Sequence, residues 1–323
     1  MEYLHEEITG TVKALQPIVH NDWEATDAFR SIPYVLQHAP NELDVADEEA
    51  YYIEDVPVVS GNSLRGIGRR HFIQHTLEEV LELDLGELTK DIWAANSWAK
   101  NCRYLTMLFY KGGVSPDGMK PKPSRAGAYE EAIKALPFLD LLGGVYGAHH
   151  IEGCLKVGFL VPRTVETQAL YVAKAEDRAS GLITLEQLKK GIKTIIQMHS
   201  SLPMDQMEPH DGEKRMMPWK SIALPAGTEF YFRASCDTQY LATMLAFHAF
   251  VGILAQYGFI GGANRAGYGR VLYDLQDFDI AAAIRAYDDY LESHREEILD
   301  GIRLIARDFK FAPPPADKKT GRK

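Results

Sequence analysis

The chain has 323 residues, of which 46% are hydrophobic and 25% are charged, and its formal net charge is −10. This length and composition predict a sizeable packed core, as one domain with large insertions or about two domains. Only Cys102, Cys154 and Cys236 are present and no CxxC pair occurs, which argues against a disulfide framework or a zinc knuckle and favours a reducing cytoplasm.

No membrane segment is expected. Residues 1–10 are acidic and lack the apolar run of a signal peptide. The longest apolar stretch, 241–260, contains His248, Gln256 and two glycines, so a buried helix is expected there.

The negative net charge argues against a nucleic-acid partner, but the charges are unevenly distributed. Residues 100–125 carry six basic side chains and one acid, and residues 61–77 carry Arg65, Arg69 and Arg70 without an acid. Since the local field decides where a phosphate binds, a nucleic-acid partner stays open.

Hydrophobic periodicity predicts a core of strand, helix, strand, strand, helix and strand. The expected strands are 7–19, 153–161, 228–234 and 270–275, and the expected helices begin at Asn62 or Ser63 and end near Leu83, and span 240–257. This order is that of an α+β, ferredoxin-like fold, the arrangement of RRM domains.

The first helix has one apolar face. Core-facing positions are Ile67, Ile73, Leu77, Val80 and Leu81, and Arg65 and Arg69 flank them. On the opposite face we expect His71, His75, Glu78 and Glu82.

Between the core elements lie three insertions, at about 20–56, 85–135 and 164–222. The third is expected to contain a short helix near 185–199. After the core, apolar residues from Ile280 to Phe309 predict one long amphipathic helix, and residues 312–323 are expected to be disordered.

Two glycine-rich motifs stand out. The first, Ser60-Gly-Asn-Ser-Leu-Arg-Gly66, opens the first helix, where free backbone N–H groups and the helix dipole favour an anion. It matches neither a P-loop nor a dinucleotide fingerprint, so no cofactor is expected. An ordinary capped helix start explains it equally well.

The second motif, Gly261-Gly-Ala-Asn-Arg-Ala-Gly-Tyr-Gly-Arg270, follows the second helix. Arg265 and Arg270 can pair with phosphates, and Tyr268 can stack on a base. A helix C-cap and turn would account for one or two of these glycines but not readily for four.

Histidine chemistry has weaker support. His71 and His75 stand four apart, but no third ligand is near, so solvated or RNA-facing side chains are expected and no metal site. The His149-His150 pair is expected to be loop structure rather than an acid–base site.

The stretch Pro57-Val-Val-Ser-Gly-Asn-Ser-Leu-Arg-Gly66 resembles the I-P-G-S-S-L-K-G signature of CRISPR-associated RAMP backbone subunits, the Cas-seven group. The Gly261–Gly269 loop resembles the glycine-rich loop of the same superfamily. The acidity of the chain and the Gly-Gly-Val-Tyr-Gly run at 143–147 point within it to the type IV branch.

This resemblance implies one RAMP domain over residues 1–323, with an RRM palm, a finger region at 85–135 and a thumb region at 164–222. Copies would stack along a guide crRNA beside a Cas-five-like and a large subunit, and would meet the target nucleic acid. By position, the implied RNA-binding residues are Gly61, Asn62, Ser63, Arg65, Arg69, Arg70, Gly261, Gly262, Asn264, Arg265, Tyr268 and Arg270, with Lys214, Arg215, Trp219 and Lys220 in the thumb. Lys111, Lys120, Lys122 and Arg125 could meet the guide or a target strand.

Some relatives in type III complexes cut RNA with an aspartate after the first strand. Asp22 and Asp27 lie in that region, but the surrounding sequence does not match, so no catalysis is expected. Two alternatives stay open: a RAMP endoribonuclease that processes the guide precursor with His71, His75 or His149, and a non-CRISPR ferredoxin-like protein that oligomerises through its last helix.

Overall fold

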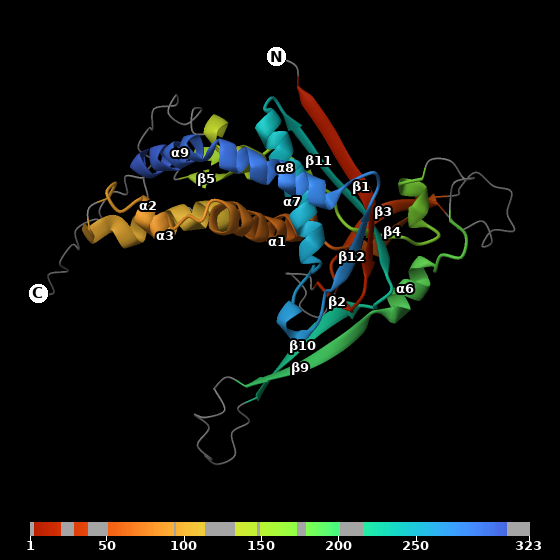
Figure 1. Cartoon of the computed structure of the whole chain (residues 1–323). Coiled ribbons are helices and arrows are strands. Elements are labelled where there is room, and N and C mark those ends of the chain that lie inside the picture. The colour runs from red at the N-terminus through yellow and green to blue at the C-terminus, as the bar shows by residue number, and fades with distance from the viewer. Residues whose placement is uncertain are drawn as a thin grey trace, which may run out of the picture.

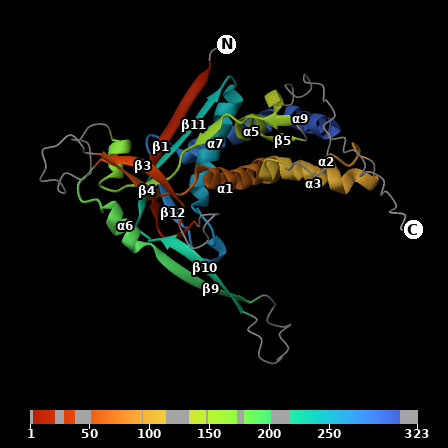
Figure 2. The same cartoon turned by 180° about the vertical axis from the view of Figure 1, so that it is seen from behind.

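The computed structural model describes residues 3–20, 29–37, 51–93, 95–113, 133–146, 149–172, 179–200 and 216–308. Helices and antiparallel strands are mixed in it, as expected for an α+β protein (Figures 1 and 2). Across these ranges, none of the helices combines the length and the apolar composition that crossing a bilayer would need.

An antiparallel sheet lies at the centre, with its strands in the order β12, β1, β11 and β7. These strands span Val271–Leu275, Leu4–Ala14, Glu229–Thr238 and Leu155–Val157, and β8 (Val161–Pro162) also pairs with β11. Their chain order around α1 and α7 is the predicted strand, helix, strand, strand, helix, strand.

Alternation along β1 gives the sheet two different faces. Ile8, Val12 and Ala14 are buried on the face that carries the helices. On the other face Lys13 pairs with Glu229 of β11 at 3.3 Å, directly opposite it in the strand register. A one-residue slip would bury these charges, so the pattern fixes the register.

Two helices, α1 (Gly61–Gln74) and α7 (Leu241–Tyr257), pack on the apolar face of the sheet, and α8 (Ile280–Ser293) packs on α7. A Cβ at Gly68 of α1 would lie 2.4 Å from the ring of Phe250 of α7, so the glycine allows the two helices to pack closely. The apolar α7 is thus covered on both sides, as predicted.

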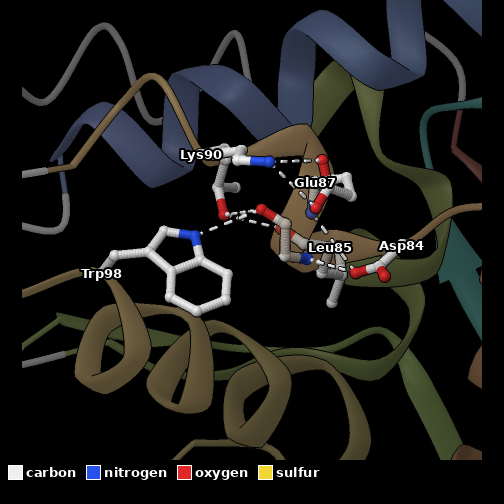
Figure 3. Close-up of polar contacts among 7 residues, drawn as sticks. Asp84, Leu85, Glu87, Lys90 and Trp98 are labelled. Atoms are coloured by element: carbon white, nitrogen blue, oxygen red, sulfur yellow. Dashed lines mark hydrogen bonds and ion pairs between the residues drawn. The ribbon is translucent and has the colours of Figure 1, made fainter. Parts of the chain in front are cut away.

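Further helices extend away from the sheet as an arm (Figure 1): α2 (Leu85–Leu88), α3 (Ala95–Lys111) and α9 (Arg295–Asp308). At the base of the arm α5 (Pro137–Leu142) packs beside α7 (Figure 2). Asp84 caps α2, and the indole Nε1 of Trp98 donates to the Gly86 carbonyl at 3.2 Å (Figure 3). The indole of Trp93 donates to Ala306 of α9 at 2.9 Å. The arm therefore joins residues from the middle and the end of the chain.

A smaller sheet projects from the body below the arm in the view of Figure 1. Its strands lie in the order β2 (Ile18–Val19), β10 (Met216–Leu224) and β9 (Lys193–Ser200). The strands β9 and β10 form a ribbon that extends away from the body of the molecule (Figure 1). Near its base lie α6 (Leu185–Gly191), the short helix η2 (Thr167–Leu170) and the hairpin of β3 (Ser31–Gln37) and β4 (Tyr51–Pro57). The short pair β5 (Gly144–Tyr146) and β6 (His149–Ile151) lies on the arm.

Several predicted boundaries are wrong. The cap of α1 is Ser60 rather than Asn62 or Ser63, and α1 gives way at His75 to a π-helix that ends at Val80. The helix predicted for 185–199 ends at Gly191, where β9 follows. The long final helix is two helices that meet at His294.

One further prediction needs correction, and one lies outside the described residues. The strand predicted for 153–161 is two short strands, β7 and β8, and the first insertion contains the β3–β4 hairpin. The expected tail at 312–323 lies beyond residue 308, where the description ends.

Candidate nucleic-acid interface

The first glycine-rich motif forms the N-terminus of α1. The Oγ atom of Ser60 accepts from the backbone N–H of Ser63 at 3.2 Å, and the first helical bond runs from Leu64 to the Ser60 carbonyl. Asn62 is exposed and Ser63 is half-buried. Since the N–H of Ser63 is already bonded to Ser60, the backbone N–H groups of Gly61 and Asn62 are those of this helix end that could receive an anion.

Gly61 has a different role from the one predicted. A Cβ there would lie 2.1 Å from the carbonyl oxygen of Val157 in β7, so this glycine allows α1 to pack on the protein's own strand. At Gly66 a Cβ would meet nothing within 4 Å, so of the two glycines in this motif Gly66 is the one that leaves room for an external backbone.

The second motif is a tight turn between α7 and β12. Gly258, Gly261, Gly267 and Gly269 all have positive φ, and Asn264–Ala266 is a short 3-10 helix, η5. At Gly269 a Cβ would lie 2.1 Å from the Ile260 carbonyl oxygen. Most of these glycines are therefore required by the turn itself.

The surface of this turn carries the remaining candidates. Gly262, Gly267 and Arg270 are exposed, and Tyr268 is half-buried. The Oδ1 atom of Asn264 is buried, and a Cβ at Gly269 would lie 2.9 Å from it. The side chain of Arg265 lies outside the described residues.

Residues 17–20 bring the two motifs together. The backbone N–H of Gly269 donates to the Pro17 carbonyl at 2.9 Å, and that of Gly262 donates to the Val19 carbonyl at 2.7 Å. The backbone N–H of Ser60 donates to Nε2 of His20 at 3.2 Å. Two segments about 200 residues apart in the chain thus share one short connector, which nothing in the sequence pattern indicated.

The same connector carries the projecting ribbon. Ile18 pairs with Leu224 and Val19 with Ala223 of β10. On β10, Lys220 is exposed, while the side chain of Trp219 lies outside the described residues together with Lys214 and Arg215. Both glycine motifs therefore lie at the base of the ribbon.

Arg69 was expected to bind a phosphate, but its guanidinium is buried and bonded to the protein's own backbone. Its side chain is 7% exposed, and its guanidinium donates to the carbonyl oxygens of Leu108, Leu142 and Gly143 at 3.2, 2.5 and 2.7 Å. Burial, with the positive charge of Arg65 nearby, lowers the pKa of Arg69 to about 10. These contacts cap the C-terminal ends of α3 and α5.

The other basic candidates differ in their surroundings. Arg65 is half-buried and also donates to the Leu142 carbonyl, at 2.5 Å. Arg70 and Lys111 are exposed. Lys120, Lys122 and Arg125 lie outside the described residues, as do Asp22 and Asp27.

His71 and His75 are half-buried, and both contact other side chains of the protein. The ring of His71 stacks on Tyr257, with centroids 3.7 Å apart. His75 lies between Glu79 and Asp288, at 2.9 and 2.8 Å from their carboxylate oxygens. The side chains of His149 and His150 are not described, and within the described ranges no three metal-ligating side chains cluster.

Two of the cysteines, distant in sequence, are neighbours in space. The Sγ atoms of Cys154 and Cys236 lie 3.5 Å apart across β7 and β11, and all three cysteines are free thiols.

Comparison with known proteins supports the resemblance at the level of the fold. No protein-family model matches the chain, and no curated protein matches it. Among solved structures, a chain of a Type IV-B CRISPR complex aligns with a TM-score of 0.50 and 19% identity, covering 84% of this chain and 91% of that one. The crystal structure of Cmr6 from Pyrococcus furiosus aligns over 84% of this chain and 99% of its own, with a TM-score of 0.37 and 16% identity.

The fold comparison and the two glycine-rich motifs therefore agree: both indicate similarity to a subunit of a CRISPR complex. The chain has the fold of a subunit found in a Type IV-B CRISPR complex, a mixed helix and antiparallel-sheet protein.

Proposed function

We propose that this chain is a guide-RNA-binding backbone subunit of a multisubunit CRISPR effector complex, of type IV, and that it catalyses no reaction itself. One observation carries the proposal: both glycine-rich motifs meet at residues 17–20, at the base of the projecting ribbon. Such a convergence offers an RNA backbone one continuous surface, where a helix N-terminus, an exposed turn and a ribbon lie together.

The central sheet would be the palm of such a subunit. Its strand order and the position of α1 and α7 on one face are those of the ferredoxin-like arrangement that RRM domains use. The arm would be the finger region and the β9–β10 ribbon the thumb, which kinks the guide.

In this proposal the guide contacts come from exposed groups and from the half-buried Gly66. Asn62, Gly66 and Arg70 would contribute from α1, Gly262 and Arg270 from the turn, and Lys220 from the ribbon. Further copies of the chain, other effector subunits and a target strand would complete the particle. We place it in the cytoplasm, which suits three free thiols.

The rival function, cleavage of the guide precursor, would need a histidine free to move a proton. His71 is stacked on a tyrosine and His75 is held between two carboxylates, which favours a structural role for both. These contacts support the non-catalytic assignment.

The first test is the ratio of absorbance at 260 and 280 nm of the purified chain, followed by sizing before and after RNase treatment. We expect a high ratio and a large species with RNA of uniform length that shrinks on RNase treatment. A nucleic-acid-free monomer that stays inert when given repeat RNA would overturn the proposal.

A charge-matched pair of double variants locates the surface. Arg70→Glu with Arg270→Glu should abolish RNA retention, because each change places a negative charge beside a phosphate. Arg285→Glu with Arg307→Glu alters two exposed arginines of α8 and α9 by the same total charge, and should retain RNA. Equal loss in both double variants would mean that total charge, and not this surface, governs binding.

A further inference from the structure

Residues 17–20 form a short extended connector whose two sides are both occupied. In an extended chain, alternate carbonyl groups point to opposite sides. The carbonyls of Pro17 and Val19 accept from the glycine turn, while Ile18 pairs with β10. The connector is thereby fixed between the turn and the ribbon by backbone bonds that no side chain supplies.

A backbone path runs from the His20 carbonyl through Arg30 to Val58, but the direct hydrogen bond from the connector to the cap of α1 is made by a side chain. Nε2 of His20 accepts from the backbone N–H of Ser60, the cap residue of α1, at 3.2 Å. The ring of His20 also packs edge-on against Phe29, with centroids 6.0 Å apart. An imidazole can accept at Nε2 only in the neutral form with its proton on Nδ1.

We infer that His20 is a positioning residue, which fixes the N-terminus of α1 relative to the glycine turn and so sets the geometry of the proposed RNA-binding surface. This inference rests on the proposed function. His20 acts through Ser60: it orients the cap, and the cap orients the exposed N-terminus of α1.

The side-chain dependence makes the inference testable, because glutamine can replace the acceptor. The amide oxygen of glutamine reaches about as far from the backbone as Nε2 of histidine and accepts hydrogen bonds. Leucine fills a similar volume without an acceptor. His20→Gln and His20→Leu therefore separate the hydrogen bond from the packing against Phe29.

Two readouts are needed. The first is the affinity for a repeat-containing RNA, for which His20→Leu should bind about three- to tenfold more weakly and His20→Gln about as well as the natural chain. The second is backbone hydrogen exchange of peptides covering 57–66 and 258–270. In His20→Leu, exchange at Ser60 should be up to about tenfold faster, with little change in the glycine turn.

His294→Leu, at an exposed position that ends α8, is the matched control and should change neither readout. His20→Leu that binds RNA and protects Ser60 like the natural chain would overturn the inference. If His20→Leu fails to fold, the glutamine variant decides: normal affinity supports the inference, and reduced affinity with a normal melting temperature overturns it.

The two proposals fail in distinguishable ways. A natural chain that binds no RNA while Ser60 exchange responds to His20→Leu would refute the proposed function, and with it the RNA role of His20. A natural chain that binds RNA while both His20 variants behave identically would refute the inference alone.

Discussion

Arg65 and Arg69 donate to the same atom, the carbonyl oxygen of Leu142, and the donor–acceptor distance is 2.5 Å in both hydrogen bonds. One turn of α1 separates the two arginines, so both guanidinium groups reach the C-terminal end of α5. In the described residues neither forms an ion pair with a carboxylate. Sequence motifs suggested phosphate ligands, but the buried guanidinium of Arg69 donates to three carbonyl oxygens of the protein.

The first prediction concerns Arg69 and stability. Arg69→Met should lower the free energy of unfolding by about 2 to 4 kcal/mol, because the three buried hydrogen bonds of the guanidinium are lost and the Gly143 carbonyl loses its side-chain donor. Arg70→Met, at the adjacent exposed position, should change it by less than about 0.5 kcal/mol. Urea unfolding followed by circular dichroism measures both, and similar stabilities for the two variants would contradict the internal role of Arg69.

A second prediction separates the two glycines of the first motif. Gly66→Ala should stabilise the chain by about 0.5 to 1 kcal/mol, because alanine favours a helix and the site is open. Gly61→Ala should destabilise it by about 1 to 3 kcal/mol, since its Cβ would press on the Val157 carbonyl. Thermal melts of both variants provide the comparison.

The same Gly66→Ala variant also reports on the proposed RNA surface. If an RNA backbone approaches α1 at this position, the added methyl group should weaken RNA binding although the protein itself becomes more stable. Unchanged affinity would move the RNA path away from Gly66.

A third prediction is a pH dependence at His75. The hydrogen bond to Asp288 raises the pKa of His75 above its ordinary value of 6.5, and the one to Glu79 adds to the effect, although burial opposes both. The folded state thus binds the proton more tightly than the unfolded chain. The resulting stabilisation is fully present below pH 6.5 and is lost as the pH rises through the folded-state pKa.

The stability difference between the natural chain and His75→Gln should therefore be largest near about pH 6 and shrink toward about pH 9. His294→Gln, at an exposed histidine, serves as the control. A difference for His75→Gln that stays constant over this range would show that His75 is not protonated in the folded chain.

A fourth prediction concerns Cys154 and Cys236. Their sulfur atoms are about 1.5 Å farther apart than bonded sulfurs, so a small side-chain rotation would join them. We expect diamide, a thiol oxidant, to take two electrons and two protons from the pair and form a disulfide. The reaction should be slow, because the hydrogen bond between the two thiols and burial raise the pKa of the Cys154 thiol.

Peptide mapping by mass spectrometry should find Cys154 linked to Cys236 and Cys102 still reduced. The closed loop is long, so the link should raise the free energy of unfolding by up to about 4 kcal/mol. Preferential modification of Cys102 would show that the pair is held too rigidly to close.

The order of the core elements was predictable because it depends on hydrophobic periodicity alone. A helix that is apolar nearly all round, as α7 is, must be buried, and a strand with alternating apolar residues, as β11 is, must have one face on the core. The boundaries of the elements were harder to predict from the sequence. Residues 185–199 were predicted as one helix, but β9 follows α6 there because pairing with β10 overrides local propensity. The break at His294 leaves no comparable gap in the apolar repeat.

The candidate site was predictable only in part. Glycine spacing identified both motifs, but it could not distinguish a glycine that admits RNA from one that admits the protein's own backbone, as at Gly61 and Gly269. Periodicity also could not show that Arg69 points inward. His20 has no motif around it, and its importance emerges only from contacts between distant segments.

The connector formed by residues 17–20 has a consequence for how such a chain can diverge. Its carbonyls alternate between the glycine turn and β10, so inserting or deleting one residue would exchange the two sides and misdirect both sets of bonds at once. Substitutions at Ile18 or Val19 leave those bonds available, because backbone atoms make them. Related chains with this architecture should therefore keep the length of the connector more strictly than its sequence.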